Sequence, residues 1–262
     1  MYDVFDDNGK VIGKINFVVW SDYFSCPNCG QEYSFWTTAI DRKNKCIRDV
    51  YPCPNCGINH SKKDSTVVME SYLDSRLGIV RQLVKYEPVI IAYKGINGGK
   101  MYTKSPSNAD LQLIERINEV QIPDWYPIDK MPDGSKTADP KSSHNIQYVH
   151  EFFSKRNLYI LARLLSKINN SIYKQSLRFL FTGILQRSSK MNRVHVNNYF
   201  NGGGGWNGGF LKGTLYVPNA PTETSIIEQI SDKLAAISRL TRSLPQYRNN
   251  VQYVGSATKL NI

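Results

Sequence analysis

Two identical CPNCG motifs hold the residues of this sequence that are best suited to chemistry. Cys26 and Cys29 belong to the first motif, Cys53 and Cys56 to the second, and 23 residues separate the two pairs. Two C-x-x-C pairs near this spacing are typical of a zinc ribbon, because four thiolates complete a tetrahedral site that has no open position. The pattern therefore predicts a structural zinc ion, with a redox dithiol or an iron–sulfur cluster as the alternatives.

Two further candidate ligands lie near these motifs. Cys46 is the fifth cysteine, and His60 follows Cys56 by four residues. Because four thiolates fill a tetrahedral site, we expect Cys46 to take no part and His60 to lie on the surface. Cysteines committed to a metal favour a reducing compartment over disulfide formation. The polar start MYDVFDDNGK and the lack of an 18-residue apolar run argue against a signal peptide and a membrane span, so the expected location is cytoplasmic, with no membrane partner.

Positive charge is concentrated in one part of the chain. The formal net charge is +11, and residues 141–212 carry eleven Lys and Arg against a single acidic residue, Glu151. Such a segment is the electrostatic signature of a polyanion site, most often nucleic acid; the alternative is a solvated basic surface. Arg187, Lys190 and Arg193 recur every three residues around the predicted end of a helix, where they would contact phosphates.

The same region contains a glycine-rich stretch with aromatic neighbours. GGGGWNGG occupies residues 202–209 and includes Trp206, while Tyr199 and Phe200 precede it. The spacing does not fit a GxGxxG nucleotide loop, and the sequence has no Walker, G-x-S-x-G or HExxH pattern. We expect either a loop that lets the backbone approach DNA or a plain surface loop. The aromatic residues either stack on bases or pack in the core.

Hydrophobic periodicity predicts an α+β fold. The expected strands are at residues 10–20, 31–38, 87–94, 101–103, 213–218 and 251–255. The expected helices are at residues 108–121, on either side of Asn169-Asn170 as an antiparallel hairpin, and from Ser225 to about Ser243. Residues 126–145 are expected to form an exposed loop. The predicted organisation is a strand plus zinc ribbon at 1–64, a mixed α/β region at 65–140, and a basic helical DNA-recognition region with a glycine-rich loop at 141–262.

The order of these motifs resembles a known family. They run VVWSDYFSCPNCG, SFW, CPNCG, IPDWYP, HEFFSKRNL, FTGILQRSSKMNR, GGGW, GTLYVP and VGSAT. In this order nearly the whole chain resembles the internal segment of large prokaryotic DNA methyltransferases that modify an exocyclic amino group of adenine or cytosine. In that family a DPFxGSG cofactor motif precedes the segment and a DPPF-type catalytic motif follows it. Neither motif occurs here, so the resemblance implies an insert between them, where a target-recognition region sits.

The resemblance also implies partners and site residues. Double-stranded DNA and the catalytic halves of the same protein are the implied partners, and S-adenosylmethionine would bind only in the parent enzyme. The chain alone is expected to bind DNA without methylating it and to hold no catalytic residue. The rivals are a zinc-ribbon RNA-binding protein and a purely structural insert. The resemblance marks eight residues as DNA-facing, and the helix face and glycine-rich stretch add Arg163 and Trp206; the eight are His150, Lys155, Arg156, Asn157, Arg187, Lys190, Asn192 and Arg193.

Overall fold

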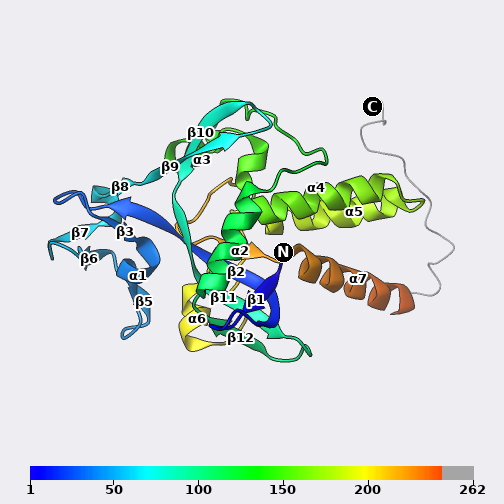
Figure 1. Cartoon of the computed structure of the whole chain (residues 1–262), viewed down its shortest axis with the longest axis horizontal. Coiled ribbons are helices and arrows are strands. Elements are labelled where there is room, and N and C mark those ends of the chain that lie inside the picture. Colours follow the sequence, from blue (N-terminus) through cyan, green and yellow to red (C-terminus); the bar gives the residue numbers. More distant parts are fainter. Residues whose placement is uncertain (244–262) are drawn as a thin grey trace.

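The computed structural model describes residues 1–243, so the strand expected at 251–255 and the VGSAT motif lie outside the described residues. The fold is α+β, as predicted from the sequence. A curled antiparallel sheet runs through the middle, three long helices cover one side of it, and a lobe of short strands lies at one end (Figure 1). The sheet is the frame that positions the candidate sites.

One long strand organises the sheet. Strand β2 (Val11–Ser25) pairs on one edge with β11 (Tyr86–Gly95), which itself pairs with β12 (Met101–Lys104). The other edge of β2 pairs with β1 (Asp3–Phe5) and with β13 (Thr222–Thr224). All of these pairs are antiparallel, and two register shifts between β2 and β11 increase the local twist.

The contact between β2 and β11 depends on Gly13. A Cβ atom at Gly13 would lie 2.1 Å from the carbonyl oxygen of Lys94 on the neighbouring strand, so a larger residue would push the strands apart. The strands predicted at 10–20, 87–94 and 101–103 correspond to β2, β11 and β12 and are confirmed.

Three helices bury one face of the sheet. They are α4 (Lys155–Asn169), α5 (Lys174–Leu185) and α7 (Ile226–Ser243). Their apolar stripes pack onto Val18 of β2, with Phe181 of α5 among the buried contacts. Helices α4 and α5 form the predicted antiparallel hairpin (Figure 1). This hairpin carries much of the basic segment.

The other face of the sheet packs on an aromatic cluster. Since successive residues of a strand point to opposite faces, Phe17 and Val19 project away from the helices. They pack with Trp36 and with Trp206, beside the short helix α6 (Val196–Asn201). The glycine-rich stretch is therefore fixed to the sheet through Trp206.

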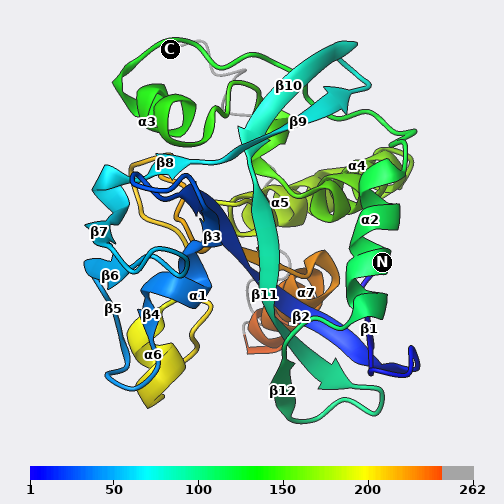
Figure 2. The same cartoon turned by 60° about the vertical axis from the view of Figure 1, so that its left-hand side comes forward.

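A lobe of short strands extends from the end of β2 (Figure 2). The last residues of β2 pair with both β3 and β8, so the lobe and the main sheet share one strand. The elements of the lobe are β3 (Glu32–Ser34), α1 (Phe35–Ala39), β4 (Ile40–Asp41), β5 (Cys46–Ile47), β6 (Val50–Pro52), β7 (Asn59–Ser61), the 3-10 turn η1 (Lys62–Asp64) and β8 (Thr66–Val67).

The strand predicted at 31–38 is wrong beyond Ser34. Helix α1 replaces it, because Phe35, Trp36 and Ala39 are all buried and a helical turn brings them onto the packed side.

The remaining elements of the fold are β9 (Met69–Asp74), β10 (Ile79–Val84), α2 (Asn108–Glu119), α3 (Ser135–His144), and the 3-10 turns η2 (Val149–Phe152) and η3 (Gln186–Ser188).

Two further predictions are corrected. The loop expected at 126–145 contains α3, which is held in place because His144 is buried with its Nε2 atom 3.2 Å from Asp22 Oδ2. The segment 213–218 is no strand; Val217 is buried in a side-chain cluster instead of pairing with the sheet. In both cases a contact with a distant part of the chain decides the local structure.

Candidate metal centre and nucleic-acid interface

The four cysteines of the CPNCG motifs converge. Their sulfur atoms all lie within 4.8 Å of one another. The Cys26 and Cys56 sulfurs are 3.8 Å apart, and those of Cys29 and Cys53 are 3.7 Å apart. Four sulfurs at about 2.3 Å from a common tetrahedral centre would be about 3.8 Å apart. The four side chains are therefore spaced to bind one metal ion.

Two equivalent turns produce this geometry. The Gly30 N–H donates to the Cys26 carbonyl and the Gly57 N–H to the Cys53 carbonyl, each at 3.0 Å. Both glycines have φ of 71°, a left-handed conformation that glycine adopts without strain. The turns lie after β2 and after β6, so the ends of these two strands lie close together where the cysteine pairs meet.

Hydrogen bonds reach the sulfur atoms from both motifs. The Asn55 side chain donates across the site to the Cys29 sulfur at 3.6 Å, and the Asn28 side chain donates to the Cys56 sulfur at 3.6 Å. The backbone N–H of Gln31, followed by Asn55, lowers the pKa of Cys29 to about 6. Donors of this kind favour the thiolate, which is the form that binds a metal.

The remaining candidate ligands lie outside this site. Cys46 is exposed on β5 and is not among the converging sulfurs, as expected. The surface position expected for His60 is wrong, because the side chain is buried. Its Nε2 atom lies 3.0 Å from the Tyr33 hydroxyl and its Nδ1 atom 3.1 Å from the Ile58 carbonyl. His60 therefore supports the packing of the lobe.

Four of the side chains predicted to face DNA are buried: His150, Arg156, Asn157 and Asn192. His150 Nε2 lies 2.7 Å from Asp74 Oδ2, and Arg156 donates to Glu223 at 3.3 Å. These partners come from strands far away in the sequence. A duplex on the outer surface does not reach these four side chains in this arrangement.

Asn157 joins several segments at a fully buried position. Its Oδ1 atom accepts a hydrogen bond from the Tyr2 hydroxyl at 2.8 Å. Its Nδ2 atom donates to the carbonyls of Ser188 at 3.0 Å and Thr224 at 3.1 Å. The Tyr2 oxygen in turn accepts from the Ile226 N–H at 2.9 Å. One side chain thus ties α4 to the residue before β1, to η3 and to β13.

The other predicted residues divide between the surface and the interior. Arg163 and Arg187 are exposed, and Arg163 donates to Asp124 at 3.3 Å. Arg193 is half-buried. Trp206 makes an edge-on contact with Phe17 at 4.6 Å between ring centroids, so its observed role is packing.

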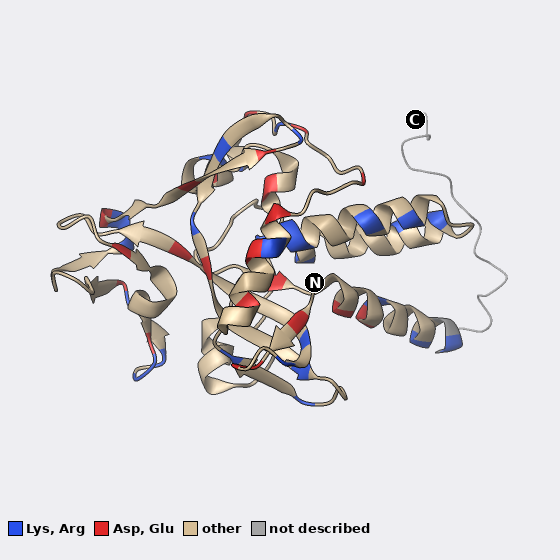
Figure 3. Cartoon of the chain, in the orientation of Figure 1, with Lys and Arg blue, Asp and Glu red and all other residues tan. Residues whose placement is uncertain are grey.

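Lysines and arginines are spread along α4 and α5 and towards the end of α7, whose first turns carry Glu228 and Asp232 (Figure 3). Helices α4 and α5 contain no acidic residue, and the Lys233 ammonium of α7 lies 3.8 Å from the Cβ position of Gly183 on α5. We define the basic helical surface by the exposed cations of these helices: Arg163, Lys167, Lys174, Arg178, Lys233, Arg239 and Arg242. Of these, the sequence analysis had singled out only Arg163 as facing DNA.

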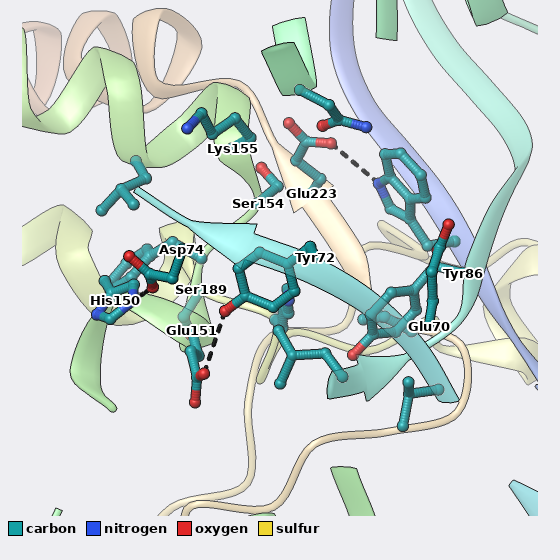
Figure 4. Close-up of a pocket in the computed structure, with 18 of the residues that line it drawn as sticks. Glu70, Tyr72, Asp74, Tyr86, His150, Glu151, Ser154, Lys155, Ser189 and Glu223 are labelled. Carbon is teal, nitrogen blue, oxygen red and sulfur yellow. Dashed lines mark hydrogen bonds and ion pairs between the residues drawn. The ribbon is translucent and has the colours of Figure 1, made fainter. Parts of the chain in front are cut away.

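A cavity of about 500 Å³ lies beside the start of α4. Its walls come from β2, β9, β11, β13, the η2–α4 junction and the segment after η3 (Figure 4). It includes Lys155 and Lys190, which were predicted to face DNA, and Tyr72 and Tyr86, which the sequence did not single out. No local pattern could reveal this cavity, because its lining extends from Trp20 to Glu223.

Comparison of the chain with protein-family models, with curated proteins and with solved structures finds no match. Among the described residues, every helix is too short or too polar to cross a lipid bilayer.

Proposed function

We propose that this chain is the DNA-binding, target-recognition segment of a site-specific, prokaryotic DNA methyltransferase of the restriction–modification kind. In the parent enzyme, the methyl group would pass from S-adenosylmethionine to an adenine or cytosine amino group. The basic helical surface carries the nucleic-acid part of the proposal, and the sequence resemblance carries the enzyme class. The expected setting is the cytoplasm, with the catalytic halves of the same protein as further partners.

The basic helical surface has the chemistry of a phosphate-binding face. Lysine and arginine contacts to phosphate position a protein on a duplex and supply most of its non-specific affinity. The connection between α4 and α5 also presents Ile172 and Tyr173, which are 89% and 67% exposed, and Phe179 on α5 is 78% exposed. Exposed aromatic and apolar side chains among cations are suited to contacts with bases or sugars.

The metal of the four-cysteine site is, on this proposal, structural zinc. Four thiolates leave no open coordination position for catalysis. The ion would hold the lobe onto the end of β2, and the same strand forms the sheet under the helices. Zinc would then stabilise the sheet that supports the basic helical surface, without contacting DNA itself.

Titration by fluorescence anisotropy tests the proposal. The chain is titrated with duplex DNA, single-stranded DNA and RNA at two salt concentrations, and a preference for the duplex that weakens steeply with salt is the expected result. Preference for RNA would instead support an RNA-binding zinc ribbon. Lack of binding to all three would support a structural insert.

A pair of charge-reversal variants locates the interface. Lys167→Glu with Lys174→Glu should weaken duplex binding on the order of tenfold or more. The control, Arg42→Glu with Lys43→Glu, changes the charge equally on the exposed turn between β4 and β5, away from the helices. Equal loss of affinity in both variants would show a general charge effect and contradict the assigned surface.

A further inference from the structure

The cavity between β9, β11 and α4 is partly open to solvent and has the size of a ligand site. Its volume of about 500 Å³ lies within the range of roughly 300–1,000 Å³ typical of small-molecule sites. Figure 4 shows Tyr72 and Asp74 on one wall, Lys155 above them and Tyr86 on the opposite side. These side chains come from separate elements, which the sheet and η2–α4 hold in place.

Three of the four carboxylates of the cavity walls, those of Asp74, Glu151 and Glu223, are already hydrogen-bonded. Glu151 accepts from Arg81 at 2.9 Å and from the Tyr72 hydroxyl at 3.1 Å, as well as from two backbone N–H groups. Asp74 is bonded to His150, and Glu223 accepts from Trp20 at 2.9 Å and from Arg156. These three acids therefore maintain the walls, whereas Glu70, the fourth carboxylate of the lining, is exposed and takes part in no ion pair among the described residues.

Two ammonium groups in the same walls lack such a partner. The ion pairs of the cavity are Arg81–Glu151, His150–Asp74 and Arg156–Glu223, and neither Lys155 nor Lys190 takes part in one among the described residues. Lys190 Nζ lies 5.0 Å from the centre of the Tyr86 ring. Burial lowers the pKa of Lys190 to about 8 and also lowers that of Lys155. Both lysines are half-buried, and an anion that enters the cavity would stabilise their charged forms against the cost of desolvation.

The rest of the lining suits a flat, aromatic body. Trp20, Tyr72, Tyr86 and Phe153 line the cavity. The Tyr86 hydroxyl is buried and has no hydrogen-bond partner among the described residues. Because this oxygen is closed to solvent, Tyr86 lines the cavity through its other atoms. The cavity thus combines aromatic walls with two lysines that take part in no ion pair among the described residues.

We propose that this cavity binds a nucleoside monophosphate unit, with its phosphate at Lys155 and Lys190 and its base against Tyr72 and Tyr86. The unit is either a free nucleotide or one nucleotide of a bound DNA strand; the second source rests on the proposed function.

Lysine footprinting on the unaltered protein tests this directly. Acetylation of each lysine is followed by mass spectrometry with deoxyadenosine monophosphate, deoxycytidine monophosphate, deoxyadenosine or inorganic phosphate present. The nucleotides should slow acetylation of Lys155 and Lys190 at least tenfold and leave the exposed Lys167 unchanged. No protection by either nucleotide or by DNA, or equal protection by inorganic phosphate or deoxyadenosine, would overturn the proposal.

Two variants and a comparison of two DNA duplexes complete the test. Lys190→Met should weaken binding of the protecting nucleotide at least tenfold, whereas Arg187→Met, an exposed cation outside the cavity lining, should not. Protection of Lys190 by a duplex with one mismatched base, but not by a fully paired duplex, would assign the ligand to a DNA strand. Protection by free nucleotide without any binding of DNA would support the cavity and contradict the proposed function, so the two failures are distinguishable.

Discussion

Replacing Asn157 by alanine separates a structural role from a role in DNA contact. The side chain is fully buried and makes three hydrogen bonds, to Tyr2, Ser188 and Thr224. At about 1 kcal/mol for each bond, Asn157→Ala should lower the free energy of unfolding by about 3 kcal/mol. For a chain of this size the melting temperature would fall by roughly 6–12 °C. The affinity of the folded variant for DNA should be unchanged.

Urea denaturation measures the loss as a shift of the midpoint at constant slope, and anisotropy at low temperature measures DNA affinity on the folded variant. Asn170→Ala is the matched control, since Asn170 is exposed and donates one hydrogen bond to the Ser166 carbonyl; its stability should change by less than about 0.5 kcal/mol. A stability loss below about 1 kcal/mol for Asn157→Ala, or lost DNA affinity with normal stability, would refute the reasoning.

Three further predictions follow from the geometry. Cys53→Ser, or chelation of the metal, should open the lobe to trypsin while the helical half stays protected; equal cleavage of both parts would contradict this. The stability of the wild type relative to Lys190→Met should rise by at most about 3 kcal/mol between pH 7 and 10. The reason is that the pKa of Lys190 is about 8 in the folded protein, which is lower than its pKa in the unfolded chain. Urea midpoints measured across this pH range check the prediction. Gly13→Ala should lower the melting temperature strongly because its Cβ meets the Lys94 carbonyl, whereas Gly95→Ala, with open space around it, should not.

Local patterns in the sequence were enough to predict several of the helices and strands of the fold. The apolar stripes of α4 and α5 and the alternation of β2 are short-range signals, and each corresponds to an element of the structure. The two CPNCG motifs likewise predicted a converging set of four sulfurs, because the turn that each motif forms fixes its own pair. These features depend on residues that are close together in the chain.

The candidate DNA site was less predictable because charge along the sequence does not reveal burial. Arg156 and His150 are part of a basic stretch in the sequence, but inside the protein Arg156 pairs with Glu223 and His150 hydrogen-bonds with Asp74. Those partners are separated from them by 67 and 76 residues. The cations of α5 were counted in the basic segment but not assigned to a site, and the packing of α7 against α5 brings Lys233 beside Gly183, which the sequence did not reveal.

The pairing of β13 with the middle of β2 has a consequence for the order of folding. Residues 17–19 obtain their second neighbour from Thr222–Thr224, about 200 residues later in synthesis. Until then, an apolar strand has an open edge, and such edges pair readily with other chains. Folding of the first strand is therefore completed late, and contacts of such long sequence separation form slowly. During synthesis, the first part of the chain would be the part most in need of protection from aggregation.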